Sequence, residues 1–180
     1  MKDNGKNPVF NGRHTFVVHV EDKPGVLNRV ASLFRRRGFN IESLTVGHSE
    51  EPGVSRMTIV MIGDNAIAKR VVENLYKLVN VVRVDDVTNN PSVLRDLALI
   101  KVKADSTVRS EVLQLCDVFR ARAVDVTPDA IIVEITGIED KIEGLLDVLR
   151  PFGIIEIART GRIAMTRGFD PAPARSRISP

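Results

Sequence analysis

The spacing of apolar residues in this chain changes in a fixed order, and that order occurs twice. Apolar residues at every second position are typical of strands, and apolar residues at every third or fourth position are typical of helices. Between residues 14 and 87 the spacing predicts strand, helix, strand, strand, helix, strand, and the series is repeated between residues 97 and 158. The expected strands are 14–20, 40–47, 55–62, 81–87, 97–102, 123–126, 130–135 and 154–158, and the expected helices are 26–37, 67–78, 108–119 and 138–149.

Each series allows few topologies, because crossover connections between strands are right-handed. It predicts an antiparallel sheet of strand order 4-1-3-2 with both helices on one face. The expected fold class is therefore α+β, with two tandem ferredoxin-like βαββαβ domains. The polar turn cluster at 88–92 separates domains at 13–88 and 94–168, and we expect the termini, 1–12 and 169–180, to be flexible.

The turn Asp22-Lys23-Pro24-Gly25 links the first strand to the first helix and is the first candidate for a binding site. Glycine lets the backbone approach a ligand closely, and a helix N-terminus behind it presents free N–H groups to an anion. Taken alone, a Pro-Gly turn is more often only a turn. The second series has Ala104-Asp105-Ser106-Thr107 at the corresponding place, so we expect any ligand pocket in the first domain.

The composition, 43% apolar and 27% charged, is that of an ordinary globular protein. The single cysteine, Cys116, excludes an internal disulfide and a cysteine-based zinc site, and its position on an apolar helix face beside Val112 predicts a buried structural thiol. No apolar run approaches the length of a membrane span, and the first residues lack the apolar core of a secretory signal. We expect a cytoplasmic protein.

Catalytic motifs are absent from the sequence. It has no Walker loop, no GxGxxG and no nucleophile elbow. The three histidines, His14, His19 and His48, have neither metal-ligand spacing nor an obvious carboxylate partner, and the alternation of the first strand predicts a solvent-facing or interface role for His19.

Nucleic-acid binding needs separate consideration, because RNA-recognition modules share this topology and the net charge is +3. Those modules stack bases on aromatic residues of the central strands. The expected third strand contains no aromatic residue, and the first contains only Phe16. The sequence therefore disfavours nucleic acid as a partner.

Several stretches are specific enough to indicate a family. The turn DKPGVL, with RRGFNIESLTVG, SRMTIVMIGD and KLVNVVRV, resembles the ACT domain of the small regulatory subunit of acetohydroxyacid synthase, also called acetolactate synthase. The second half is similar to the C-terminal domain of that subunit, through RDLALIKVKA, DVFRARAVDVTP and EIARTGRIAMTRG. The resemblance covers residues 13 to 168.

The resemblance implies a regulator of branched-chain amino-acid biosynthesis that is not itself an enzyme. Such subunits raise the activity of the catalytic large subunit and confer feedback inhibition by a branched-chain amino acid, usually valine. The catalytic subunit carries thiamine diphosphate, Mg²⁺ and FAD, so no cofactor or metal is expected on this chain. ACT proteins of this kind pair side by side, as a homodimer or higher oligomer, with effector sites at the interface.

The same resemblance implies which residues bind the effector. The N–H groups near Gly25, Val26 and Leu27 would bind its carboxylate. The side chains of Asp22 and Asn40 would accept its ammonium protons, and Val26 and Ile41 would pack against its branched side chain. The expected effector-binding residues are thus Asp22, Gly25, Val26, Leu27, Asn40 and Ile41.

Other interpretations stay open at this point. Many family members carry Asn in place of Asp22, and a carboxylate there would repel that of the effector. Asp22 is also compatible with a helix cap, and Asn40 with a polar strand start. The chain could be a stand-alone ACT-type amino-acid sensor that controls another protein, or a small enzyme of acylphosphatase type on the same fold.

Overall fold

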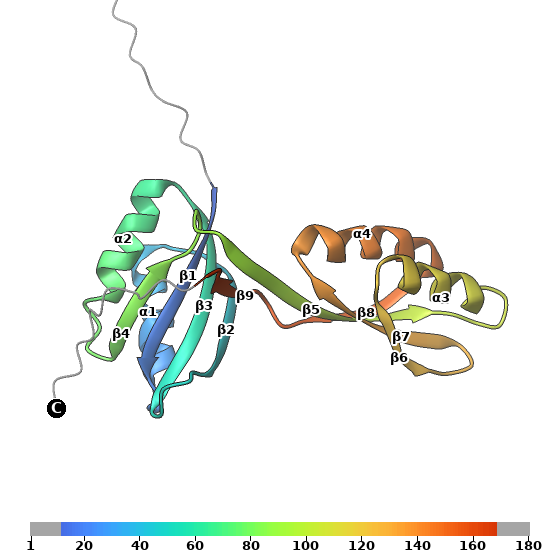
Figure 1. Cartoon of the computed structure of the whole chain (residues 1–180), viewed down its shortest axis with the longest axis horizontal. Coiled ribbons are helices and arrows are strands. Elements are labelled where there is room, and N and C mark those ends of the chain that lie inside the picture. Colours follow the sequence, from blue (N-terminus) through green and yellow to red (C-terminus); the bar gives the residue numbers. More distant parts are fainter. Residues whose placement is uncertain (1–11, 169–180) are drawn as a thin grey trace, which may run out of the picture. The chain divides into compact units, whose positions relative to one another are not determined.

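The computed structural model describes residues 12–168 of the chain (Figure 1). They divide into two compact units, residues 12–93 with 164–168, and residues 94–163. The terminal stretches 1–11 and 169–180, for which we expected flexibility, lie outside the described residues. Gly12, which we placed in the flexible N-terminus, begins the first strand.

The first unit contains four strands and two helices in the predicted sequence order. Its strands lie side by side in the order β2-β3-β1-β4, and every pairing is antiparallel, as the 4-1-3-2 topology requires (Figure 1). Strand β2 is therefore an edge of the sheet. The elements are β1 (Gly12–Glu21), α1 (Val26–Arg37), β2 (Ile41–His48), β3 (Val54–Gly63), α2 (Asn65–Leu75) and β4 (Val81–Asp86).

Both helices of the first unit cover the same face of its sheet. Helix α1 contributes Val30 and Phe34 to one buried apolar cluster, and α2 contributes Val71 and Leu75. Phe16 of β1 is fully buried in the same cluster. Burial of this apolar surface is the main force that holds the helices on the sheet.

Helix α1 begins and ends at glycines in the left-handed conformation, Gly25 with φ 83° and Gly38 with φ 68°. The amide of Phe39 donates to the carbonyl of Phe34 at 3.0 Å, which closes the last turn. Arginines 35–37 occupy that last turn, where positive charge meets the negative end of the helix dipole. These features explain why the helix is confined to 12 residues.

The second unit repeats the plan, with strand order β6-β7-β5-β8. Its core includes Cys116, so the predicted burial of this thiol is confirmed, and that burial raises its pKa. Its elements are β5 (Ser92–Lys103), α3 (Arg109–Val118), β6 (Arg122–Val126), β7 (Ala130–Gly137), α4 (Glu139–Leu149), the 3-10 turn η1 (Arg150–Phe152) and β8 (Ile154–Arg159). A further short strand, β9 (Ile163–Thr166), which we did not predict, pairs with β5, and from Ala164 on it belongs to the first unit.

A bulge changes the faces of β2. Regular alternation would place Ile41 and Leu44 on opposite faces, but both pack against the apolar core of the first unit. The pairing with β3 shifts between Ile41 and Ser43. One inserted residue reverses the alternation of side chains, so a simple period of two places Ile41 on the wrong face.

The sheet face that points away from α1 and α2 is also largely buried. We expected a solvent-facing or interface role for His19, and its side chain is only 6% exposed, so the solvent-facing alternative is wrong. Thr58, on the neighbouring strand β3, is 1% exposed. Arg56 of β3 donates a hydrogen bond to the backbone carbonyl of Ala164 in β9.

Candidate functional site

The turn between β1 and α1 is bound to the hairpin between β2 and β3. The amide of Asp22 donates to the carbonyl of Gly53 at 2.8 Å, and the amide of Lys23 donates to the carbonyl of Glu21 at 3.0 Å. These bonds position the turn before the helix begins. The candidate site therefore lies on a loop that backbone hydrogen bonds hold in place.

Gly25 occupies the N-cap position of α1 with φ 83° and ψ −6°, and no side chain caps the helix there. Residues with a Cβ are strained in this left-handed region, whereas glycine is not. A Cβ built on Gly25 would have no atom within 4 Å. The backbone conformation therefore requires the glycine, and open space lies beside it.

Several N–H groups at this helix end are available to a ligand. The amide of Val26 donates to the carbonyl of Lys23 at 3.3 Å. Within the described part of the chain, the amides of Gly25, Leu27 and Asn28 have no acceptor. Unpaired amides at the positive end of a helix form a site suited to a carboxylate or another anion.

The Asp22 carboxylate contacts two side chains of the neighbouring hairpin. Ser55 Oγ donates to Asp22 Oδ1 at 3.0 Å, and His48 Nδ1 lies 3.5 Å from Asp22 Oδ2. The N-cap of α1 is Gly25, so the helix-cap interpretation of Asp22 is wrong. Our expectation that His48 has no carboxylate partner is also wrong, because the hairpin brings it to the turn.

A second group of polar residues braces the turn from the side of β4. Arg29 Nη1 donates to Asn80 Oδ1 at 2.7 Å, and Asn80 Nδ2 donates to Glu21 Oε2. The hydrogen bond from Asn80, followed by one from Lys23, lowers the pKa of the Glu21 carboxyl. We did not single out Asn80 or Glu21 from the sequence, because the residues that they connect are far apart along the chain.

The remaining predicted residues, Asn40 and Ile41, lie at the opposite end of the sheet. Ile41 is paired with Met61, and Met61 with His14 near the start of β1. The Gly25 turn follows the far end of β1, beyond Glu21. Helix α1, with 12 residues and a length of roughly 18 Å, separates Gly25 from Asn40. Within one chain, Asn40 and Ile41 therefore do not lie next to the Gly25 turn.

The apolar side chains of the predicted site differ in exposure. Val26 is 4% exposed and belongs to the core, so its side chain is not available as the wall of an effector pocket. Leu27, the next residue, is 43% exposed. Ile41 is partly buried against the core. Leu27 is thus the apolar side chain that the turn presents to solvent.

Residues 12–168 contain no cluster of three or more His, Cys, Asp or Glu side chains able to hold a metal ion. Over the same residues, the helices all fall short of the length and apolar character that crossing a bilayer demands.

Models of two protein families match the chain. Residues 16–83 match the small-subunit-like ACT domain of AHAS, and residues 95–168 match the family described as the small subunit of acetolactate synthase. A probable acetolactate synthase small subunit of Archaeoglobus fulgidus is 53% identical over 156 residues, which are 87% of this chain and 98% of that protein. The small subunit of Mycolicibacterium smegmatis is 48% identical over 155 residues, 86% of this chain and 91% of that protein.

Solved structures give the same result. The crystal structure of the acetolactate synthase small subunit from Thermotoga maritima matches with a TM-score of 0.82 and 42% identity, and the match covers 88% of this chain and 99% of that one. The similarity extends over both units, which confirms the tandem ferredoxin-like fold. The chain therefore belongs to the family of small, non-catalytic regulatory subunits of acetolactate synthase, an enzyme of branched-chain amino-acid biosynthesis.

Proposed function

We propose that this chain binds the catalytic subunit of acetolactate synthase, raises its activity, and makes it sensitive to feedback inhibition by a branched-chain amino acid, valine being the first candidate. Family membership supports the catalytic subunit as partner. The observation that carries the effector site is the glycine turn at the start of α1, which combines unpaired amides with open space beside Gly25.

The effector's groups can be assigned to residues of the turn. Its carboxylate would accept hydrogen bonds from the amides of Gly25 and Leu27, and its ammonium would donate to Asp22. Ser55 and His48 draw the Asp22 carboxylate toward the hairpin, which limits its repulsion of the effector carboxylate. Leu27 would supply the apolar wall at the turn.

The complete site needs a second chain. Asn40 and Ile41 stand at one end of α1 and the glycine turn at the other, and β2 is an exposed edge. Two chains related by a twofold axis, with their β2 edges and α1 helices antiparallel, would place Asn40 and Ile41 of one chain beside the turn of the other. This homodimer, alone or within a higher oligomer, would have two equivalent effector sites.

The cofactors of the reaction, thiamine diphosphate, Mg²⁺ and FAD, would be bound by the catalytic subunit, and this chain would contribute none. We further propose that the complex works in the cytoplasm. The free, buried thiol of Cys116 agrees with a reducing compartment.

Reconstitution with the catalytic subunit tests the proposal. Acetolactate formation should rise when this chain is added, and valine should then inhibit it. Gly25→Asp should retain activation and lose inhibition, because a negative charge would occupy the carboxylate position. Gly25→Asn is the matched control, since it adds similar bulk in a conformation that Asn tolerates but adds no charge. Gly25→Asn should therefore retain more of the valine inhibition than Gly25→Asp does.

The same experiment separates this function from that of a stand-alone sensor. A sensor for another protein would neither co-purify with the catalytic subunit nor change its turnover. Equal inhibition in wild type, Gly25→Asp and Gly25→Asn would show that the effector binds elsewhere.

A further inference from the structure

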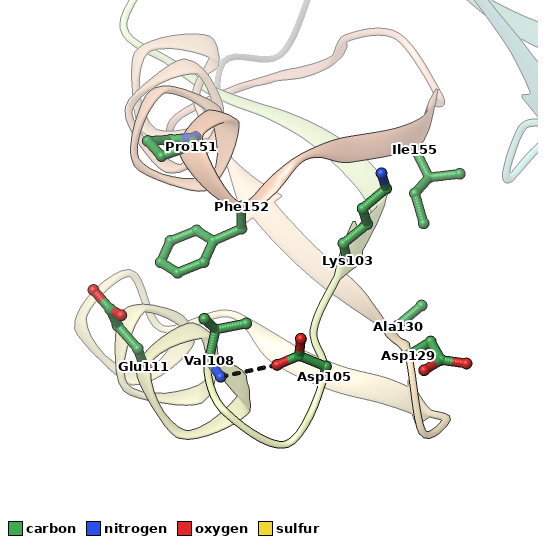
Figure 2. A pocket seen from close by; sticks show the side chains of 9 residues that line it. All are labelled: Lys103, Asp105, Val108, Glu111, Asp129, Ala130, Pro151, Phe152 and Ile155. Carbon is green, nitrogen blue, oxygen red and sulfur yellow. Dashed lines mark hydrogen bonds between the residues drawn. The ribbon is translucent and has the colours of Figure 1, made fainter.

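The second unit contains an open cavity of about 760 Å³ at the end of β5, where the chain turns into α3 (Figure 2). This is the position that the Gly25 turn occupies in the first unit. We had expected any ligand pocket in the first domain, and this cavity lies in the second. Its lining residues are Lys103, Asp105, Val108, Glu111, Asp129, Ala130, Pro151, Phe152 and Ile155.

The lining combines an apolar wall with several charges. Figure 2 shows Phe152 and Val108 on one side of the cavity and Asp129 with Ala130 across from them. Three carboxylates and one lysine border the space, so the lining carries an excess of negative charge. Such a lining favours a cation with an apolar body over an anion.

Three of these charges have no partner in the part of the chain that the structure describes. Over the described residues, the side chains of Lys103, Glu111 and Asp129 make no hydrogen bond and no ion pair. The fourth, Asp105, accepts bonds from the side chain and amide of Thr107. Those bonds lower the pKa of Asp105, which keeps the carboxylate ionised.

The two turns that carry Asp105 and Asp129 are held together by Arg109. Its Nη2 donates to the carbonyls of Thr127 at 3.0 Å and Pro128 at 2.6 Å. The amide of Ala104 donates to the carbonyl of Asp129 at 2.9 Å. The acidic rim of the cavity is therefore braced across two loops.

Gly153 leaves room for the lysine. It has φ 93°, and a Cβ there would lie 3.3 Å from Lys103 Cδ. The amide of Lys103 donates to the carbonyl of Gly153 at 3.0 Å. The lysine stem is thus packed along the cavity wall, and its ammonium group is free to meet an anionic group of a ligand.

We propose that this cavity binds a small primary amine with an aliphatic body, of the alkylamine or amino-acid class. The ammonium group donates to Asp129, and the aliphatic body packs on Phe152 and Val108 across the cavity. A carboxylate, where the ligand has one, pairs with Lys103. The inference is independent of the Gly25 turn, which lies in the other unit.

Titration of the full-length, ¹⁵N-labelled chain tests the proposal by NMR. The probes are 3-methylbutylamine and its anionic counterpart 3-methylbutanoate, with L-leucine as a third arm. The amine should shift the amide resonances of Val108, Glu111 and Ala130 in a saturable way, and 3-methylbutanoate should not. Tighter binding of L-leucine than of the amine assigns the amino-acid class, and weaker binding assigns the alkylamine class.

Variants test which side chain of the cavity binds the ammonium group. Asp129→Asn should weaken binding of 3-methylbutylamine about tenfold, because the charged acceptor of the ammonium group is lost. Asp117→Asn, which removes an exposed carboxylate outside the lining, is the matched control and should bind as wild type. Over the described residues the Asp129 carboxylate makes no hydrogen bond and no ion pair, so the spectrum of Asp129→Asn should otherwise be unchanged.

Three results would overturn the proposal. They are an absence of saturable shifts at Val108, Glu111 and Ala130, equal affinity of wild type and Asp129→Asn for 3-methylbutylamine, and equal binding of 3-methylbutanoate. None of them bears on valine inhibition through the Gly25 turn. Loss of valine inhibition in Gly25→Asp, in turn, should leave these shifts intact.

Discussion

Ser55 Oγ donates a hydrogen bond to Asp22 Oδ1 at 3.0 Å, and this contact joins the start of β3 to the turn before α1. Ser55 is 7% exposed, so its hydroxyl has little access to water as a replacement partner. The bond connects two segments that are 33 residues apart in the chain. It makes the geometry of the candidate effector site depend on the β2–β3 hairpin.

Replacing Ser55 by alanine should therefore reduce stability. We expect Ser55→Ala to lower the free energy of unfolding by about 1 kcal/mol, the usual loss for one buried hydrogen bond. Urea denaturation measures the difference. Ser106→Ala, at an exposed turn residue, is the control and should change stability by less than about 0.5 kcal/mol. Equal effects of the two substitutions would show that the Ser55 bond contributes nothing.

Glycine at position 25 is required by the backbone alone, which gives a second prediction. Gly25→Ala should destabilise the protein by about 1–2 kcal/mol, because φ is 83° and a Cβ is strained there, although no atom obstructs it. Gly12→Ala also meets no atom within 4 Å but lacks a positive φ, and should be close to neutral. Thermal unfolding of both variants checks this, and similar midpoints would contradict it.

Stability should also fall in mildly acidic solution because of His19. Its burial, together with the positive charges of Arg83 and Arg56, lowers its pKa in the folded protein. The unfolded chain then binds the proton more readily, so the free energy of unfolding decreases as pH falls below the ordinary histidine pKa of about 6.5.

One such group changes stability by at most about 1.4 kcal/mol per pH unit. His19→Gln should have a shallower slope between roughly pH 7 and pH 5, measured by urea denaturation at several pH values. An unchanged slope would show that His19 is protonated equally in both states.

Dimers of two different variants test whether the effector site is shared between chains. Gly25→Asp damages the turn, and Asn40→Ala damages the strand end that the partner would contribute. Each variant alone should show no valine binding. A mixed dimer, isolated with two affinity tags, should regain one of its two sites, because one turn and the opposing Asn40 are both intact. Calorimetry gives the stoichiometry. No recovery would place all the binding residues in a single chain.

The strand order was predictable because the order of strand-like and helix-like spacings along the chain could be read from the sequence. Right-handed crossovers then allow one sheet topology for that order. The bulge at Ile41 and the strand β9 were not predictable. The bulge makes the core-facing Ile41 and Leu44 three positions apart, and the sequence does not distinguish this spacing from two residues on opposite faces of a regular strand. Strand β9 is four residues long, too short for any period to be recognised.

The candidate site shows a similar division. Gly25 and the helix that follows it were predictable, because proline, glycine and the apolar spacing mark a turn and a helix start. Ser55 and His48 were not, since their contact with Asp22 depends on the register of β1 against β3. The cavity beside Lys103 was missed because we compared only the turn sequences, whereas its walls come from segments far along the chain.

The separation of Gly25 from Asn40 by the length of α1 has a consequence for how such a sensor responds to its own abundance. If each effector site is shared between two chains, a chain outside the dimer carries one half of each of two sites and binds the amino acid with neither. Dilution of the subunit would then have the same effect as a lack of valine. A cell that makes too little of this subunit would lose feedback inhibition even in the presence of abundant valine.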